Sequence, residues 1–452
     1  MRTPILVKTM DPLRVKDNST IEKKDFYKIK NLEAKILNKT LKDLEKEGIF
    51  LFPQIISESQ DVEGSQTILR MEDGYYKTGN IMGFLGCGLE RLIIKSRFSK
   101  NDEDYFFQYL LSRVLDIPNV VNMETDSNNE NSIINYLCFL FPYLLKVALR
   151  KGIFKQYVCN EYNDSNVKGS IDIARHIKYN TPFVGRIAYK QRTFSYDNYL
   201  LQLVRHTIEF IKNTSFGNML LSNVKMEIQL IVDVTFTYRV QDRQIIINKN
   251  KKNLVRHAYY HEYRALQNLC LLILHNQKGQ IGVGHNKLYG ILFDGAWLWE
   301  EYINLLIGKD FYHPKNKSHL GSEQLFSGNR QQGLIYSDFI GRDANNRIIA
   351  DAKYKPIDNI RSKDYLQVLA YMFRFDAKIG YYLYPESTGK DSETLRLNQG
   401  TKHEQNVSAR EDIYVMKCGL EIPCHTSNYQ EFVDKIKINE HKFKSNFSNM
   451  QS

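Results

Sequence analysis

The chain has 452 residues, of which 42% are hydrophobic and 25% charged, and this excludes a mainly disordered protein. Lys and Arg outnumber Asp and Glu by 62 to 51, and the resulting net charge of +11 favours a polyanionic partner, either nucleic acid or an anionic membrane surface. The most apolar stretch, residues 136–145, is too short to span a membrane, and the first ten residues lack the apolar core of a signal peptide. We therefore expect a cytoplasmic protein of two or three domains without a membrane partner.

The N-terminal part of the chain combines a helical pattern with short β-like runs. Residues 21–47 are rich in Lys and Glu, carry Leu and Ile at helical spacing and stop before Gly48, which predicts one exposed amphipathic helix. Residues 49–98 contain period-two apolar runs separated by glycines, which predicts a small antiparallel unit, with a barrel as one arrangement. Residues 102–115 predict a helix with one apolar face.

The central part of the chain is predicted to be mostly helical. Two segments, residues 168–180 and 183–198, read as extended. A helix follows at residues 199–213, with Asp197 or Asn198 as its N-cap.

The C-terminal part alternates strands with helices. After a helix at Ala296 to Ile307, the pattern is strand, turn, strand, helix and strand, over residues 333–341, 342–346, 347–355, 362–375 and 378–385. Residues 412–418 predict a further strand, and the final ten residues of the polar C-terminal tail are expected to fray.

Three domains follow from these patterns. Residues 1–160 form a β-rich N-terminal domain with helices, residues 161–280 a central linking region, and residues 281–452 an α/β domain with a polar tail. The fold class is therefore α+β or α/β.

Two carboxylates and a lysine in the C-terminal part carry the clearest chemistry. A turn-rich stretch separates Asp338 from Asp351, so a hairpin would bring Asp338 beside the second strand. Within that strand, period two places Asp351 and Lys353 on one face and points Ala352 away from it. Carboxylates hold Mg²⁺, which needs only one or two of them besides water and phosphate. The set is therefore suited to phosphodiester cleavage assisted by a divalent metal.

An Asp followed two residues later by Lys is also a common solvated pair on exposed strands. Here, however, Ile348, Ile349 and Ala350 make Asp351 the end of an apolar run, which is typical of a strand that is covered on both faces. A carboxylate at such a position is costly unless it is paired or binds a metal.

Two neighbouring helices offer further candidates. Glu300 and Glu301, in the helix at Ala296 to Ile307, could border the same site or could form an ordinary charged helix face. Gln367 and Tyr371 lie four residues apart on one helix face and could contact phosphate or the lysine, or could serve helix packing.

Together these motifs resemble the core of PD-(D/E)xK nucleases, a superfamily that includes the RecB-like branch. They are Glu300, the SD pair ending at Asp338, the DAK triplet at 351–353 and the Gln367-xxx-Tyr371 pair. More narrowly, the chain is similar to the McrC family, the nuclease subunits of McrBC-type modification-dependent restriction systems, and to the related LlaJI-type subunits. The similarity runs from about residue 75 to 385. It departs from the family pattern at Ser337, where proline is usual.

The resemblance implies a Mg²⁺-dependent DNA endonuclease subunit that works with a McrB-like AAA+ GTPase hexamer in phage defence. It implies an N-terminal domain that docks on the GTPase and stimulates GTP hydrolysis, followed by an α/β/α restriction-endonuclease-like domain. It assigns catalytic roles to five residues, Asp338, Asp351, Lys353, Glu300 and Gln367. The metal ligands would be Asp338, Asp351, Ala352 and Glu300, and Mn²⁺ could substitute for Mg²⁺.

Two alternatives stay open at the level of the sequence. The chain could act chiefly as an activator of the GTPase ring, with the nuclease site secondary, because the sequence contains no GxxxxGK[ST] motif of its own. It could also be a standalone repair nuclease of the RecB-like kind, which Gln367 and Tyr371 suggest.

Overall fold

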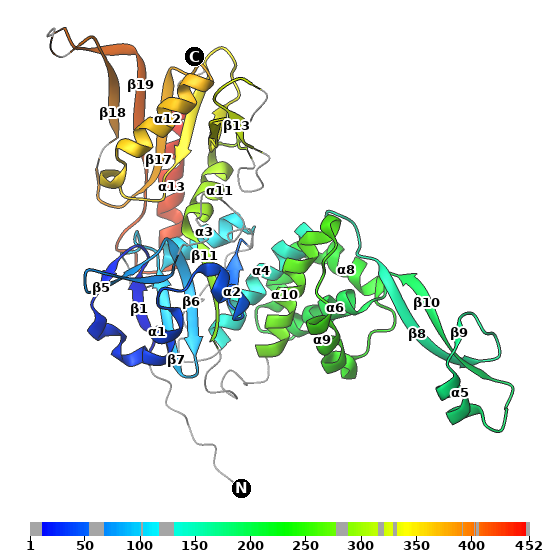
Figure 1. The fold of residues 1–452 in the computed structure, drawn as a ribbon. Helices are drawn as coiled ribbons and strands as arrows, with labels where there is room; N and C mark the ends of the chain where they lie inside the picture. Colours follow the sequence, from blue (N-terminus) through cyan, green and yellow to red (C-terminus); the bar gives the residue numbers. More distant parts are fainter. Residues whose placement is uncertain are drawn as a thin grey trace. The chain divides into compact units, whose positions relative to one another are not determined.

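The computed structural model describes most of the chain (Figure 1). The described residues are 11–53, 67–100, 103–116, 131–276, 288–314, 321–328, 332–390, 392–401, 403 and 406–448. They form two compact units, one from residues 1–133 and 281–452 and the other from residues 134–280. The predicted division into 1–160, 161–280 and 281–452 differs from these units, because the N- and C-terminal parts of the chain pack into a single body.

A five-stranded sheet joins the two ends of the chain. Its order is β1-β7-β6-β11-β3, with bounds Leu13–Lys16, Glu90–Lys95, Ile81–Cys87, Leu288–Asp294 and Phe50–Phe52. Strand β11 pairs antiparallel with β6 and parallel with β3, and β1 pairs parallel with β7. The antiparallel unit predicted within residues 49–98 is confirmed in part, because β6 pairs antiparallel with β7 inside that segment. It is not a separate unit, because β1 and β11 enter the same sheet from outside the segment and form parallel pairs with β7 and β3.

Glycines allow β6 and β11 to lie close together. Gly83 has a φ of +138° and Gly290 a φ of +157°, values that side-chain-bearing residues rarely adopt. A Cβ atom on Gly83 would lie 2.2 Å from the carbonyl oxygen of Ile291, and one on Gly290 would lie 2.2 Å from that of Phe84. These two glycines of the N-terminal sheet thus serve strand contact.

Short helices and a second, three-stranded sheet cover the N-terminal sheet. The helices are η1 Lys23–Ile29, α1 Lys30–Ile36 and α2 Leu41–Lys46, and the sheet order is β2-β5-β4, with bounds Thr20–Ile21, Tyr75–Thr78 and Leu69–Glu72. The single helix predicted over residues 21–47 is therefore wrong. The chain breaks at Asn38, whose φ is +55° and whose backbone N–H donates to the Leu69 carbonyl at 2.8 Å.

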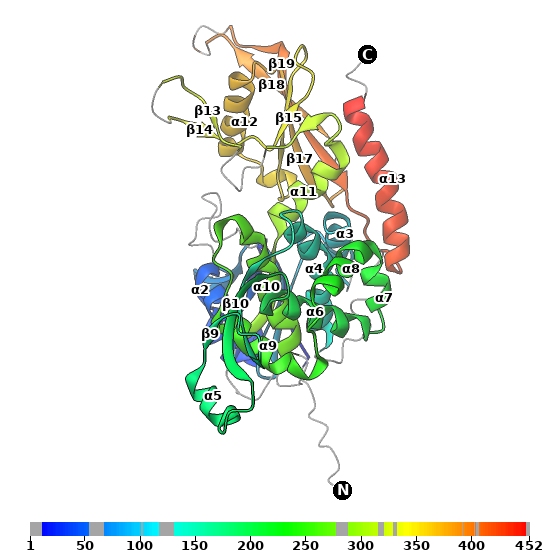
Figure 2. The ribbon, with the colours of Figure 1, turned by 90° about the vertical axis from the view of Figure 1, so that its right-hand side faces the viewer.

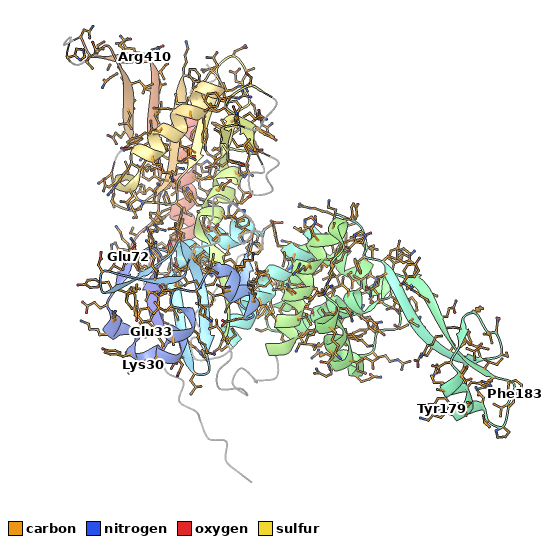
Figure 3. All side chains as sticks on the ribbon, viewed as in Figure 1. Lys30, Glu33, Glu72, Tyr179, Phe183 and Arg410 are labelled. Atoms are coloured by element: carbon orange, nitrogen blue, oxygen red, sulfur yellow. The ribbon has the colours of Figure 1, made fainter. Side chains whose placement is uncertain are left out.

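The second unit is mainly helical. Its helices are α4 Asn131–Leu149, α5 Ile173–Asn180, α6 Tyr199–Lys212, α7 Gly217–Leu220, η3 Leu221–Val224, α8 Lys225–Val234, η4 Val240–Asp242, α9 Arg243–Lys252, η5 Ala258–Tyr260 and α10 His261–Asn276. A long hairpin of β8 Gln156–Asp164 and β10 Ile187–Ser195, with β9 Ser170–Ile171, carries α5 at its far end (Figure 1). Near α5 the hydrophobic rings of Tyr179 and Phe183 are exposed (Figure 3).

The predictions for this unit are confirmed in part. Strand β10 and helix α6 lie where they were expected, and the side chain of Asn198 accepts hydrogen bonds from the N–H groups of Leu200 and Leu201, as an N-cap does. The extended segment predicted over residues 168–180 is wrong beyond Ile171, because the Asp172 side chain caps α5 by accepting from the N–H of Arg175.

The C-terminal part of the first unit contains a six-stranded sheet. Its order is β12-β15-β16-β17-β19-β18, with bounds Phe311–Tyr312, Phe339–Gly341, Ile348–Ala352, Ile379–Glu386, Ser408–Glu421 and Glu393–Gln399. The central strands β16, β17 and β19 are parallel, and β12, β15 and β18 are antiparallel to their neighbours. A short pair, β13 Glu323–Gln324 and β14 Leu334–Ile335, accompanies the sheet.

Helices cover both faces of this sheet. They are α11 Gly295–Ile307, η7 Ile357–Asn359, α12 Ser362–Arg374 and α13 Tyr429–Ser448. On one face the Tyr382 hydroxyl donates to the Asp364 carbonyl of α12 at 2.7 Å, and on the other the Trp299 indole N–H of α11 donates to the Leu383 carbonyl at 3.0 Å. Figure 2 shows α12 and α13 on opposite sides of the sheet. The unit is therefore a mixed α/β structure, which confirms the coarse fold class.

Helix α13 anchors the C-terminal end of the described chain. The carboxylate of Glu440, which is buried, accepts hydrogen bonds from the hydroxyls of Tyr109 at 2.6 Å and Tyr302 at 2.7 Å. Tyr109 belongs to α3 Tyr105–Val114, a helix that the sequence predicted correctly. The prediction that the C-terminal tail frays is wrong as far as Ser448, because this segment forms α13 and apolar residues such as Phe443 pack inward. Among the helices in the described part of the chain, none is long and apolar enough to cross a membrane.

The shared core of the first unit predicts a stability effect. Leu292 in β11 is fully buried among N-terminal core residues, so Leu292→Ala should lower the free energy of unfolding by about 2–5 kcal/mol. Urea denaturation measures this change, and Ile438→Ala on the exposed side of α13 should change it by less than about 0.5 kcal/mol. Equal effects of the two substitutions would contradict the shared core.

Candidate functional site

The β15–β16 hairpin brings Asp338 beside the end of β16. Phe339 pairs with Ala350 and Ile340 with Ile349. The same register places Asp338, the residue before Phe339, opposite Asp351. The backbone N–H of Ala352 donates to Oδ2 of Asp338 at 2.8 Å. The hairpin that the spacing predicted is confirmed, although the strand before it is interrupted between β14 and β15.

Asp351 and Lys353 share one face of β16, as period two predicted. The Lys353 ammonium lies 2.7 Å from Oδ2 of Asp351, whose side chain is 1% exposed. The backbone N–H of Lys353 donates to the Leu383 carbonyl of β17 at 2.9 Å, so the ladder fixes this residue although β16 ends at Ala352. The ion pair is therefore held between two parallel strands.

Helix α12 completes the surroundings of the lysine. Lys353 donates to Oε1 of Gln367 at 3.1 Å, and Nε2 of Gln367 donates to the Tyr371 hydroxyl at 2.6 Å. Asp364, near the start of the helix, lies 4.0 Å from Lys353 and accepts from Lys355 at 2.7 and 2.8 Å. Gln367 and Tyr371 thus contact the lysine network, which was one of the two functions predicted for them.

A histidine joins α11 to Asp338, the residue before β15. Nδ1 of His313 donates to the Asp338 carbonyl at 2.7 Å, and its ring stacks on Phe339 with centroids 4.9 Å apart. Its Nε2 lies 3.7 Å from the Glu300 carboxylate and 3.8 Å from that of Glu301. Glu300 therefore lies at the border of the site, and its catalytic and metal-binding roles stay predictions.

The negative charges of the site repel one another. Burial, together with the charges of Glu300 and Asp351, raises the pKa of Asp338 well above its usual value, although Lys353 opposes the shift. Burial also raises the pKa of Asp351, again against the effect of Lys353. Binding of a cation between these carboxylates would relieve the repulsion and keep both ionised.

Lys353 is a cation at this site. Burial alone would lower its pKa, but the carboxylates of Asp351 and Asp338 outweigh burial and raise it. For the Tyr371 hydroxyl, burial itself raises the pKa, and this group therefore stays neutral. Lys353 can donate hydrogen bonds and stabilise negative charge, but it is not suited to accept a proton.

The donor set fits a hard divalent cation that keeps several water or phosphate ligands. Within the described ranges, no group of three or more His, Cys, Asp or Glu side chains is placed to hold a metal ion on its own. Asp338 and Asp351 supply two carboxylates, the number that Mg²⁺ commonly takes from a protein. Sites for zinc usually have more protein ligands, with nitrogen or sulfur among them.

Sequence reasoning missed three residues of this network, His313, Lys355 and Asp364. Asp364 could have been found, because it accepts from the N–H of Arg361 at the start of α12, a position where acidic residues are common. His313 carries no spacing signal, since its partners come from α11 and from Asp338, the residue before β15.

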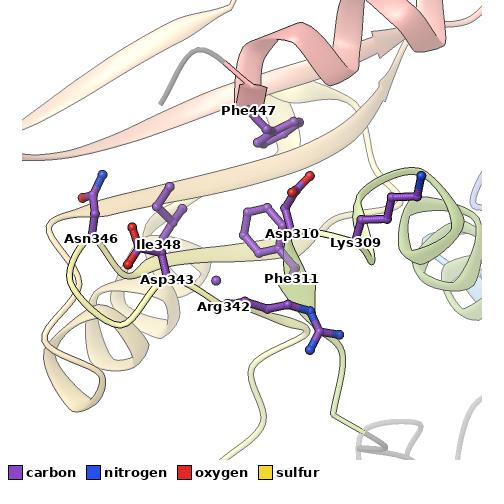
Figure 4. A pocket seen from close by; sticks show the side chains of 9 residues that line it. Lys309, Asp310, Phe311, Arg342, Asp343, Asn346, Ile348 and Phe447 are labelled. Atoms are coloured by element: carbon purple, nitrogen blue, oxygen red, sulfur yellow. The ribbon is translucent and has the colours of Figure 1, made fainter. Parts of the chain in front are cut away.

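A small cavity lies at the other end of β16. Figure 4 shows its lining, which includes Phe311, Arg342, Ile348 and Phe447, and its volume is about 130 Å³. Ile348 begins the strand that Ala352 ends, and the cavity is lined by none of the predicted site residues.

Residues 76–385 match the family model described as the McrBC 5-methylcytosine restriction system component. The chain belongs to this family. The match spans more than half of the chain and includes Glu300 and the whole β15–β16–α12 site, and it confirms the resemblance found in the sequence.

Two solved assemblies from Thermococcus gammatolerans are similar to this McrBC family member. One is a refined half-complex from a tetradecameric assembly of McrB AAA+ hexamers with bound McrC, at 15% identity and a TM-score of 0.47, covering 94% of this chain and 99% of the other. The second is a cryo-EM structure of the McrBC complex, at 14% identity and a TM-score of 0.32, covering 66% and 88%. No curated protein matches the chain.

The environment of His313 predicts a pH dependence of stability. Burial would lower its pKa, but Glu301, the Asp338 carbonyl and Glu300 outweigh burial and raise the pKa to about 9 from 6.5. A raised pKa stabilises the folded state below pH 6.5, and this contribution is lost as the pH rises through 9. Between pH 6 and pH 10 the loss should reach about 3 kcal/mol.

Urea denaturation of the wild type and of His313→Gln in EDTA measures this contribution, because the difference between the two proteins isolates one residue. The variant should lose less stability than the wild type over the same pH range. Identical pH profiles would show that His313 is not held as a cation in the fold.

Proposed function

We propose that this McrBC family member is the nuclease subunit of its restriction system and hydrolyses DNA phosphodiester bonds with the help of Mg²⁺. The observation that carries the proposal is the meeting of Asp338, Asp351 and Lys353 at one end of β16, with both carboxylates at raised pKa. Parallel strands covered by helices on both faces support a PD-(D/E)xK nuclease domain, the finer fold assignment that the motifs imply.

Asp338, Asp351 and the backbone carbonyl of Ala352 would hold the metal, with Glu300 as a further candidate. Mn²⁺ could replace Mg²⁺, because both cations prefer oxygen ligands. The chemistry that such a cation supplies is the polarisation of water and of a phosphate oxygen.

The other residues of the site act on charge and position. Lys353, protonated and 2.7 Å from Asp351, is suited to stabilise the negative charge that develops on the scissile phosphate. Gln367 accepts a hydrogen bond from Lys353 and donates one to Tyr371, so α12 fixes the direction of the ammonium group. This arrangement positions the lysine before the substrate arrives.

The family also supports a partner. As a component of a 5-methylcytosine restriction system, the chain would act with a McrB-like AAA+ GTPase hexamer that recognises modified DNA. The N-terminal part of the chain would dock on the hexamer and stimulate GTP hydrolysis, and the C-terminal sheet would cut the DNA.

Loss of the site should abolish cutting. With the partner GTPase, GTP and Mg²⁺, Asp351→Asn and Lys353→Ala should each lower the rate of cleavage of methylated DNA by at least about 100-fold. The first removes a metal-binding charge, and the second removes the ammonium that stabilises the reacting phosphate. EDTA should stop the wild type, and Mn²⁺ should restore it.

Asp343→Asn provides the matched control, since this exposed carboxylate lies in the turn of the same hairpin and should leave cleavage unchanged. If Asp351→Asn or Lys353→Ala cuts as well as the wild type, the assignment of the site fails. Strong cutting by the isolated chain without GTP would favour a standalone nuclease of the RecB-like kind.

Cutting and stimulation of the partner should be separable. Asp338→Asn keeps an oxygen that can accept from the Ala352 N–H but removes a metal-binding charge, so it should lose cleavage and retain full stimulation of GTP hydrolysis. A GTPase assay at saturating variant measures this. Loss of both activities in a folded variant would contradict separate functions for the two sheets.

A further inference from the structure

A second, larger cavity lies beside the nuclease site within the first unit. Its volume is about 510 Å³, within the range of ordinary ligand pockets. Ala352, Lys353 and Tyr354 form one side, and Asn80 and Arg97, which lie just before β6 and just after β7, form another. The cavity is therefore continuous with the site through Lys353, but its other walls come from residues without a part in the proposed chemistry.

The lining of this cavity is strongly basic. Four of the ten residues are cations, namely Arg97, Lys353, Lys355 and Arg361, and none is an aspartate or a glutamate. Three asparagines, Asn18, Asn80 and Asn359, add neutral donors and acceptors. A cavity of this composition is suited to a polar anion.

The four cations differ in how far they are already neutralised. Arg97 pairs with Asp17 at 2.6 Å, Lys353 with Asp351 at 2.7 Å and Lys355 with Asp364 at 2.7 Å. Arg361 is exposed, and its backbone N–H donates to the Asp364 carboxylate. Its guanidinium has no carboxylate partner in the described part of the chain. Arg361 therefore supplies the charge that a bound anion would neutralise.

Arg97 is held in place before any ligand binds. Its Nε and Nη2 donate to Oδ2 of the buried Asp17 at 3.0 and 2.6 Å, and Nη2 also donates to Asn80 at 2.5 Å. Its guanidinium lies 5.0 Å from the ring centroid of Tyr354, the residue after Lys353. A fixed guanidinium loses little conformational entropy when it binds phosphate.

We propose that this cavity binds a backbone phosphate of the DNA strand next to the phosphate that is cut. The inference rests on the proposed function and names a subsite for it, in which Arg361 and Arg97 hold the neighbouring phosphate while Lys353 faces the scissile one. DNA carries one phosphate per about 3.4 Å of axis on each strand, so a strand seated at Lys353 must place another phosphate close by.

DNA binding without cleavage tests the subsite. Fluorescence anisotropy with a labelled DNA duplex in EDTA, at 50–200 mM KCl, measures the affinity of the full chain and its salt dependence. Arg361→Gln should weaken binding roughly tenfold at the lowest salt and reduce the slope of log K against log salt by about 0.9, the value for one phosphate contact. Arg361→Lys, which keeps the charge, should retain the slope.

Arg410→Gln is the control for an arginine outside the cavity. Arg410 lies in β19 (Figure 3) and, unlike Arg361, pairs with a carboxylate, Asp412, at 2.8 Å. The slope for Arg410→Gln should equal that of the wild type. If Arg361→Gln leaves affinity and slope unchanged, or if Arg410→Gln reduces them equally, the subsite is overturned. Arg97 is unsuitable for this test, because its loss would leave Asp17 buried without a partner.

A competition experiment separates a DNA phosphate from a free anion. Inorganic phosphate, compared with chloride at equal ionic strength, should not displace the duplex selectively. Selective displacement that Arg361→Gln abolishes, without a change in DNA affinity, would overturn the proposal in favour of a small-anion site. Failure of the nuclease assignment can be told apart from failure of the subsite. Normal cutting by Asp351→Asn would contradict the nuclease assignment, but it would not change the DNA affinities measured in EDTA.

Discussion

The burial of Asp351 beside Lys353 is the interaction on which the functional part of this protein depends. A carboxylate that is 1% exposed is costly without compensation, and a single ammonium at 2.7 Å supplies only part of it. The fold therefore gathers further groups around the pair. Gln367 from α12 holds the Lys353 ammonium, and the charge of Lys355 also favours the ionised form of Asp351. The cost in stability is consistent with a site that is kept for chemistry, since a metal ion would complete the charge balance.

Tyr354 connects this site to the rest of the first unit. It follows Lys353 directly, its hydroxyl contacts the hydroxyl of Ser96, the residue after β7, at 2.7 Å, and its ring leaves no room for a Cβ on Gly295. The end of β16 is thus held from two sides, by β17 through the backbone and by the N-terminal sheet through one aromatic side chain. This contact adds to the pairing of β11 with β6 and β3, which joins the two ends of the chain.

The candidate site was largely predictable because its central signals are local. Period two within β16 was enough to place Asp351 and Lys353 on one face, and a turn-rich stretch was enough to bring Asp338 across a hairpin. Helix spacing likewise placed Gln367 and Tyr371 together. His313 could not be found in this way, because its contacts with Glu300, Glu301 and the Asp338 carbonyl join three segments whose packing no short pattern encodes.

By itself, the sequence determined the mixed α/β class, the hairpin of the site and the family, since these depend on short-range periodicity and on motifs read along the chain. Only the tertiary structure decided that β11 enters the N-terminal sheet, that Asn38 breaks the first helix and that the C-terminal segment forms α13. It also decided that Arg97 and Arg361 line one cavity with Lys353. Such pairings are fixed by burial and by hydrogen bonds between residues distant in sequence, whose energies no local pattern records.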